Sequence, residues 1–211
     1  NCFDLVLADQ MIQENQVVIR NNLVLSPDEH ILVLTGPNQG GKTTYARMIG
    51  QVFYLASLGI LVPGSAVTLF LPDRIFTHFE RQESQETLNG KLKDDIVRIH
   101  DILQKVTENS LILINEMFSS TTLRDAAWLG KKIFNDIDRI GCLCLYVTFI
   151  NELSTYLPGT VSLISQIGED GEKRTYQIIR AGSDGKAYAS SMVKKYALTY
   201  EAIQERIGSG R

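Results

Sequence analysis

The chain has 211 residues and a mass of 23.6 kDa, which predicts one large domain or one domain with an appendage. Apolar residues make up 44% of the chain and charged residues 21%, a globular balance that excludes wholesale disorder. The net charge of −3 argues against a protein that holds a nucleic-acid backbone by bulk charge, because phosphate binding requires clustered Lys and Arg.

The first part of the chain predicts several strands and one helix. Residues 30–35 (HILVLT) are nearly all apolar, as in a strand that is buried on both faces. A glycine-rich turn follows, and residues 42–58 then carry the apolar stripe of a helix that Gly59 ends. Further strands are expected at residues 2–8, 17–25, 66–71 and 74–79.

The second part alternates helices with short strands. Helices are expected at residues 94–106, 123–140 and 190–207, with Trp128 in the core, and residues 80–93 are polar and partly loop. Strands are expected at 111–114, 145–148, 160–167 and 173–180, the last two joined by a hairpin turn at 169–171. This alternation predicts an α/β fold with a mainly parallel sheet flanked by helices. The early strands add an antiparallel β flank.

The cysteine count and the hydropathy indicate the cellular compartment in which the protein is expected. The three cysteines, at positions 2, 142 and 144, lack the even count and the spacing of a disulfide framework, which indicates a reducing, cytoplasmic environment. No apolar run reaches the length of about 18 residues that a membrane span needs, so no membrane partner is expected. The chain begins without Met and inside an expected strand, and we interpret residues 1–211 as a domain excised from a longer protein.

The strongest signal is a glycine-rich motif between the strand at 30–35 and the helix at 42–58. It fits the pattern G-x-x-x-x-G-K-[ST] and consists of Gly36, Pro37, Asn38, Gln39, Gly40, Gly41, Lys42 and Thr43, followed by Thr44. Glycines let backbone N–H groups converge on phosphate oxygens, and the helix N-terminus adds partial positive charge. Lys42 is expected to reach the β- and γ-phosphates of ATP, and Thr43 to offer its hydroxyl to Mg²⁺.

An acidic residue follows the buried strand at 111–114. Glu116, at the C-terminal end of a parallel strand, falls in the ligand crevice and is the natural general base for an attacking water. Asn115 occupies the position where an Asp usually helps to hold Mg²⁺, and its carbonyl can bond a Mg²⁺-bound water. The alternative is that Glu116 only caps the segment after it.

These motifs resemble the ATPase domain of the MutS family, the mismatch-repair and recombination ATPases of the ABC class. Residues 35–45 are similar to the family's TGPNMGGKSTY loop, and residues 73–77 match its DRIFT stretch. Residues 58–63, 113–116 and 186–188 agree, in order, with the segment after the P-loop helix, the Walker B strand and the closing K-S-Y-G element. The resemblance covers nearly the whole chain and implies a P-loop NTPase fold like that of ABC ATPases.

The resemblance also implies a mechanism. ATP with Mg²⁺ binds the loop at residues 36–44, and a second copy of the chain closes over it, which implies a homodimer through the ATPase face. Gly90, at the position of the family's signature segment, would reach the γ-phosphate across that interface. The family's adenine contacts come from residues 19–22, which implicates Asn22. ATP cycling would drive DNA engagement by domains outside this chain.

Four departures from the family pattern suggest a divergent subgroup. Asn115 replaces the Asp of the usual Asp-Glu pair, and residues 117–122 replace a Gly-Arg-Gly-containing run. Phe149 stands where the family has a γ-phosphate-sensing His, and Gly90 falls where the family has its S-T-F-M signature. Because the loop lysine and Glu116 remain, we expect ATP hydrolysis to persist at a reduced rate.

Two other functions stay open at this point. A P-loop small-molecule kinase would need an acceptor pocket and an arginine-rich lid, whereas Arg81 and Arg98 are isolated in the sequence. A non-hydrolysing ATP-binding switch is favoured by Asn115 and Phe149 and opposed by Glu116. A single-turnover measurement of ATP hydrolysis separates the switch from the ATPase.

Overall fold

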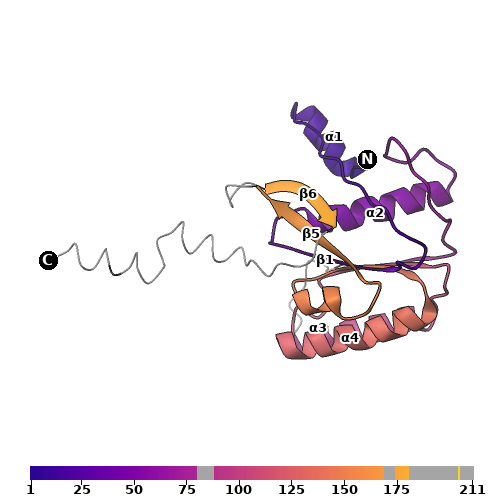
Figure 1. Ribbon diagram of the computed structural model, residues 1–211, viewed down its shortest axis with the longest axis vertical. Helices are drawn as coiled ribbons and strands as arrows, with labels where there is room; N and C mark the ends of the chain where they lie inside the picture. Colours follow the sequence, from indigo (N-terminus) through magenta and orange to yellow (C-terminus); the bar gives the residue numbers. More distant parts are fainter. Residues whose placement is uncertain (80–87, 169–173, 181–203, 205–211) are drawn as a thin grey trace.

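The computed structural model describes residues 1–79, 88–168, 174–180 and 204. These residues form a six-stranded sheet with helices on both faces, as Figure 1 shows. The helices are α1 (Leu5–Gln13), α2 (Lys42–Ser57), α3 (Leu88–Leu103) and α4 (Leu123–Ile140), with a 3₁₀ helix at Asn151–Thr155. The strands are β1 (Ile31–Thr35), β2 (Ile75–His78), β3 (Leu111–Asn115), β4 (Leu143–Val147), β5 (Val161–Ile167) and β6 (Arg174–Arg180). The predicted mixed α/β fold is confirmed. No helix among these described residues has the length and apolarity to cross a membrane.

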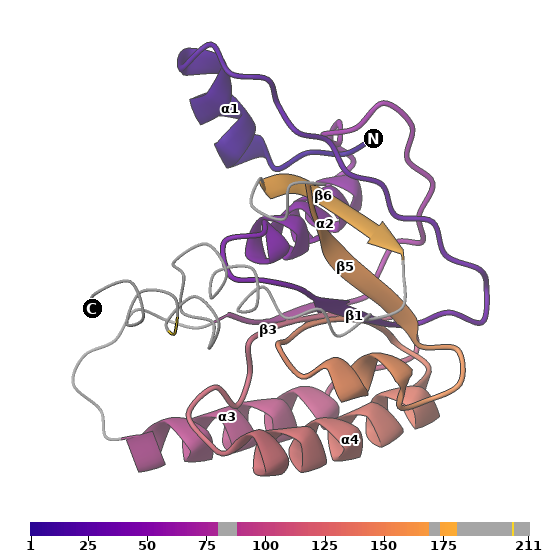
Figure 2. The ribbon, with the colours of Figure 1, turned by 60° about the vertical axis from the view of Figure 1, so that its left-hand side comes forward.

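The central strands are apolar because both faces of the sheet are covered. Every residue of β1, β3 and β4 is buried. Alternate residues of β1 face opposite sides: Ile31 and Val33 pack with α3 and α4, whereas Leu32 and Leu34 pack with α2. Figure 2 shows α2 on one side of the sheet and α3 with α4 on the other. Polar functional residues can therefore gather only at the strand ends and in the loops that follow them.

The strand order brings the two sequence motifs together. The order is β2-β3-β4-β1-β5-β6, with parallel pairing from β2 to β5 and antiparallel pairing of β5 with β6. β4 lies between β1 and β3, and Val147 at its end pairs with Leu34 on one side and Asn115 on the other. The loop after β1 and the loop after β3 therefore leave the sheet at the same edge.

The strand expected at residues 2–8 is wrong, since the helix α1 begins at Leu5. The Asp4 carboxylate caps this helix by accepting a hydrogen bond of 2.8 Å from the Leu7 amide. The same carboxylate pairs with Arg47 of α2, at 2.6 Å from Nε and 3.0 Å from Nη2. This contact between two helices is tertiary, so the local pattern of the segment does not reveal it.

The strands expected at residues 17–25 and 66–71 are also wrong. Asn21 forms an isolated bridge with Cys2. Its side-chain amide also donates to one backbone carbonyl of β6 and accepts from one backbone amide of β6, two groups that a neighbouring strand would otherwise have paired. In residues 66–71, Phe70 packs edge to face on a phenylalanine of α2, and the segment joins no strand of the described sheet. The antiparallel flank predicted from the early segments is therefore wrong, and β6 supplies the antiparallel edge instead.

The second half of the chain follows its predictions more closely. α4 spans the predicted residues 123–140, with Thr122 as its N-cap and Gly141 in the left-handed conformation after it. α3 begins at Leu88, earlier than the predicted residue 94. The prediction for Trp128 is wrong: its side chain is 59% exposed, because the alanines at the two preceding positions of α4 face the core. Apart from residue 204, the predicted turn at 169–171, the segment 186–188 and the helix at 190–207 lie outside the described residues.

Candidate functional site

The glycine-rich loop joins β1 to α2 and turns sharply at three residues. Gly36, Gln39 and Gly41 have φ angles of 132°, 61° and 87°. A Cβ atom at Gly36 would lie 2.9 Å from Cβ of Ser165 on β5, and one at Gly40 would overlap the serine hydroxyl. That hydroxyl donates to the Gly40 carbonyl at 2.5 Å. Ser165 therefore holds the loop against the sheet and leaves no room for a side chain at two of the motif's glycines.

Lys42 lies inside this loop. Its side chain is 4% exposed, and Nζ donates to the carbonyl oxygens of Gly36 at 2.9 Å and Pro37 at 3.0 Å. Burial lowers the pKa of Lys42 below its usual value, the charge of Glu116 opposes this change, and the charge of Arg174 adds to it. A buried ammonium group with one carboxylate at 4.0 Å is a site that attracts further negative charge.

Thr43 in the first turn of α2 meets Asn115 at the end of β3. The Thr43 hydroxyl donates to Oδ1 of Asn115 at 3.1 Å, which joins the two motifs across 72 positions of the sequence. Asn115 itself is buried. Both groups are uncharged oxygen ligands of the kind that a hard cation such as Mg²⁺ accepts, although neither is a carboxylate.

Glu116 follows Asn115 in a sharply turned loop. Its φ angle is 54°, and its amide donates to the carbonyl of Val147 at 2.9 Å. The side chain is 31% exposed, and Oε1 lies 4.0 Å from Nζ of Lys42. A carboxylate that faces the loop lysine and still reaches solvent can accept a proton from a nearby water. The helix α4 that follows this loop is capped by the hydroxyl of Thr122 and not by Glu116.

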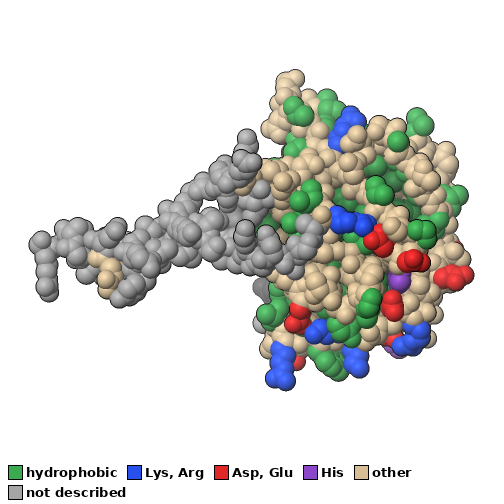
Figure 3. Space-filling view, in the orientation of Figure 1, with side chains coloured by type: hydrophobic (Ala, Val, Ile, Leu, Met, Phe, Trp, Pro, Cys, Tyr) green, Lys and Arg blue, Asp and Glu red, His purple; other side chains and the backbone are tan. Residues whose placement is uncertain are grey.

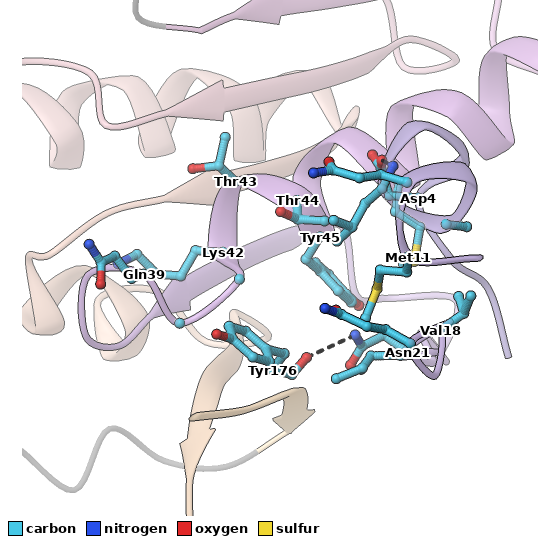
Figure 4. A pocket seen from close by; sticks show the side chains of 18 of the residues that line it. Asp4, Met11, Val18, Asn21, Gln39, Lys42, Thr43, Thr44, Tyr45 and Tyr176 are labelled. Atoms are coloured by element: carbon cyan, nitrogen blue, oxygen red, sulfur yellow. Dashed lines mark hydrogen bonds between the residues drawn. The ribbon is translucent and has the colours of Figure 1, made fainter. Parts of the chain in front are cut away.

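These residues border a pocket of about 640 Å³, a size that suits a small-molecule ligand. The pocket extends from the glycine-rich loop to α1, as Figure 4 shows. Residues 38–44 and Glu116 form one polar end, whereas the end at α1 combines the apolar side chains of Met11 and Val18 with polar side chains of α1 and of the segment after it. Tyr176 of β6 lies between the two ends. This arrangement suits a ligand with charge on one side and a flat, less polar group on the other.

The structure places most of the predicted site residues together. Asn38, Gln39, Gly40, Gly41, Lys42, Thr43, Thr44 and Glu116 line the pocket. Gly36 and Pro37 lie behind them, with their carbonyls on Lys42, and Asn115 lies behind Thr43. The two predicted residues that lie elsewhere are Asn22 and Gly90.

Asn22, which the resemblance implicates in adenine contact, does not line the pocket. Its carbonyl accepts a hydrogen bond of 3.0 Å from the Tyr45 hydroxyl, and its side-chain oxygen accepts one from the backbone nitrogen of Asn1. The neighbouring Asn21 lines the pocket in its place. In an extended segment, a shift of one residue turns the side chain to the opposite side.

Gly90 lies in the first turn of α3, on the face of the sheet opposite α2 (Figure 2). It does not line the pocket of its own chain.

Tyr176 is a pocket residue that sequence reasoning missed, and Asn21 falls within the expected range 19–22 but was not singled out there. Nδ2 of Asn21 donates to the Tyr176 carbonyl at 3.1 Å, the bond drawn in Figure 4, and the Ile178 amide donates to Oδ1 of Asn21 at 2.7 Å. Tyr176 has a φ angle of 56°, and its Cδ1 lies 3.5 Å from the position that a Cβ atom at Gly41 would take. Asn21 and Tyr176 are 155 positions apart, so no local sequence pattern could have paired them.

Comparison with protein families places this site in a known context. The family model described as MutS domain V matches residues 32–200 of the chain. The match includes the glycine-rich loop, the Asn115-Glu116 pair and Tyr176.

Individual relatives give the same family. An endonuclease MutS2 from Staphylococcus saprophyticus is 28% identical over 198 residues, which cover 91% of this chain and 25% of that protein. A DNA mismatch repair protein MutS from Halothermothrix orenii is 29% identical over 183 residues, which cover 83% of this chain and 20% of that protein. An endonuclease MutS2 from Thermus thermophilus is 25% identical over 189 residues, which cover 88% of this chain and 25% of that protein. The chain thus spans about a quarter of the length of these relatives.

Proposed function

The chain belongs to the MutS domain V family, and on this premise we propose that its pocket binds ATP with Mg²⁺ and hydrolyses the bond to the γ-phosphate. The observation that carries this proposal is the convergence of Lys42, the Thr43–Asn115 pair and Glu116 at one end of a 640 Å³ pocket. A cation, a metal-ligating hydroxyl and a base are the groups that phosphoryl transfer to water requires.

In this proposal the triphosphate of ATP takes the polar end of the pocket. The backbone N–H groups of residues 38–44 and the N-terminus of α2 face the phosphates. On binding, Lys42 gives up its hydrogen bonds to two loop carbonyls and donates to charged phosphate oxygens, which form stronger hydrogen bonds. The adenine takes the other end, between Tyr176 and the apolar side chains of Met11 and Val18.

Thr43 and Asn115 are the residues that would hold Mg²⁺, Thr43 directly and Asn115 through a water. Their oxygen atoms lie 3.1 Å apart beside the N-terminus of α2, and both are oxygen donors of the kind that would suit Mg²⁺. When bound, Mg²⁺ supplies positive charge that neutralises the phosphates. Because Asn115 is uncharged, its hold on the cation is weaker than that of a carboxylate by about 1–2 kcal/mol.

Glu116 is the general base of the proposed reaction. Its carboxylate accepts a proton from water as the water oxygen bonds to the γ-phosphorus, and the bond from that phosphorus to the bridging oxygen breaks. The products are ADP and inorganic phosphate. Lys42 stabilises the negative charge on the phosphate oxygens in the transition state.

The wider role is proposed from the relatives, which are named DNA mismatch repair protein MutS and endonuclease MutS2. We propose that this chain is the C-terminal, ABC-like ATPase domain of a MutS-like DNA repair or recombination protein, excised from a longer chain. Two copies close over the nucleotide, with Gly90 of one copy at the γ-phosphate of the other. DNA contact falls to other domains. On the face shown in Figure 3, Lys and Arg side chains are interspersed with Asp and Glu and do not gather into a basic stripe.

A non-hydrolysing ATP-binding switch is the second candidate. Asn115 would hold the cation without a negative charge, and Phe149, in the segment after β4, is an exposed aromatic residue whose side chain offers no hydrogen bond to a phosphate. These two departures are also the reason for proposing a divergent subgroup. The retained Glu116, beside Lys42, argues for turnover.

One experiment separates these functions. The chain is titrated with ATP and Mg²⁺ by calorimetry, and phosphate release is then measured under single-turnover conditions. Binding followed by phosphate release is expected. Binding without release would favour the switch, and absence of binding would overturn both functions. Transfer of the phosphate to an added small-molecule acceptor, in place of water, would favour a kinase.

A further inference from the structure

A buried contact between a histidine and an aspartate lies next to the loop that carries Glu116. Nε2 of His78 on β2 lies 3.2 Å from Oδ1 of Asp95 on α3, and the two side chains are 7% and 10% exposed. The second carboxylate oxygen, Oδ2 of Asp95, accepts a hydrogen bond of 3.1 Å from the amide of Phe118. One carboxylate therefore joins β2, α3 and the loop that follows β3.

This loop is anchored on both sides of its turn. The Glu116 amide donates to Val147 of the sheet at 2.9 Å, and the Phe118 amide donates to Asp95 of α3 at 3.1 Å. Glu116 and Phe118 have φ angles of 54° and 64°, a region that non-glycine residues occupy only when the surrounding contacts impose it. The orientation of Glu116 thus depends on both anchors.

The chemistry of Asp95 exceeds what packing requires. A buried charge costs free energy unless it is paired and hydrogen-bonded, and an apolar side chain of similar volume would fill the same space. Such an apolar side chain could not accept a hydrogen bond from the Phe118 amide.

We propose that Asp95 is a positioning residue for Glu116, because its carboxylate fixes the turn at Phe118 while it pairs with His78. The inference rests on the proposed ATPase function. Asp95 does not line the pocket, so it acts through the loop backbone. Since Asp95 belongs to α3, a displacement of that helix would move the Phe118 anchor and, with it, the general base.

The test compares three variants of the chain. Asp95→Leu removes the acceptor at similar volume, and Asp95→Asn keeps one oxygen for the Phe118 amide and an amide group for His78. Asp94→Leu is the matched control, because Asp94 is exposed on the same helix. Each variant is measured for thermal unfolding, for ATP affinity by calorimetry and for phosphate release in a single turnover.

Asp95→Leu is expected to lower the phosphate-release rate by about 100-fold, the cost of a small misplacement of a catalytic group, while its ATP affinity stays that of the wild type. Asp95→Asn should stay within about tenfold of the wild-type rate, because an oxygen acceptor remains. Asp94→Leu should match the wild type in both measurements.

A folded Asp95→Leu variant that releases phosphate as fast as Asp94→Leu would overturn the positioning role. Equal losses of ATP affinity and release rate would also overturn it, because they indicate a purely structural role. If Asp95→Leu does not fold, amide hydrogen exchange in the wild type decides: the Phe118 amide must exchange slowly, and exchange at the rate of an exposed amide would contradict the anchor. Absence of hydrolysis by the wild type would instead overturn the proposed function, together with the inference that rests on it.

Discussion

The hydroxyl of Thr43 lies 3.1 Å from the amide oxygen of Asn115, so the phosphate loop is tied directly to the strand that leads to Glu116. The contact exists because β4 lies between β1 and β3 and pairs with both, which brings the ends of these strands to one edge. It joins two uncharged groups. The charge of a cation placed there would be balanced mainly by the nucleotide.

Replacement of Asn115 by Asp should strengthen the hold on Mg²⁺. A carboxylate beside the Thr43 hydroxyl adds a charged oxygen ligand, so the Mg²⁺ concentration for half-maximal ATP hydrolysis should fall by about tenfold. The measurement is the ATPase rate as a function of Mg²⁺ concentration. Asn109→Asp, at an exposed position, is the control. The same Mg²⁺ response in Asn115→Asp and in the wild type would refute this role for Asn115.

ATP affinity should depend on pH through Lys42. Burial lowers the pKa of this lysine, so its charge is present below the lowered pKa and is lost as the pH rises through it. ATP affinity, measured by calorimetry, should therefore begin to fall at a pH below the usual lysine value of 10.5. Lys42→Ala should bind ATP about 10- to 100-fold more weakly and without this pH dependence. Unchanged affinity in Lys42→Ala would remove the lysine from the phosphate site.

Glu116→Gln should retain ATP binding and lose hydrolysis. The amide keeps the shape of the side chain but cannot accept the proton of the attacking water, so the single-turnover rate should fall by about 100-fold or more. Phosphate release and nucleotide affinity are measured in parallel, with Glu108→Gln as an exposed control. Hydrolysis by Glu116→Gln at the wild-type rate would assign the base to another group.

The contact between Gly40 and Ser165 predicts a compensating pair of substitutions. Gly40→Ala places a methyl group against the serine hydroxyl, which should displace the loop and abolish ATP binding. Ser165→Gly removes the obstructing side chain, so the double variant should recover part of the affinity. The Pro37 carbonyl, 3.0 Å from the added methyl group, limits the recovery. Wild-type ATP affinity in Gly40→Ala alone would contradict the packing argument.

Tyr176→Ala should weaken the binding of ATP without weakening the binding of inorganic triphosphate. Loss of a ring that stacks on a nucleobase costs about 1–3 kcal/mol, whereas the phosphate contacts lie at the other end of the pocket. Competition titrations with the two ligands measure the difference. Tyr54→Ala serves as the control, since Tyr54 is exposed on α2 and does not line the pocket. Equal losses for both ligands would place the adenine elsewhere.

The parts of the site that could be predicted have contiguous determinants. The buried run before Gly36 and the amphipathic helix after it identify the phosphate loop, because strand, turn and helix N-terminus follow one another in the chain. The same holds for α4, whose N-cap Thr122 and terminal Gly141 mark its ends. The short apolar strand before Asn115 likewise indicated the second motif.

The sequence by itself determined the phosphate loop, the acidic strand end and the alternation of helices and strands, since short-range periodicity and glycine placement decide these features. Tertiary structure decided which residues complete the pocket. Asp4 caps α1 while it pairs with Arg47, Asn21 reaches Tyr176 from 155 positions away, and Ser165 packs under the loop from β5. Each of these contacts joins segments that are distant in the chain. The local sequence pattern of each segment either favours a strand or favours no particular structure, and the contact forms only when the folded sheet brings the two segments together.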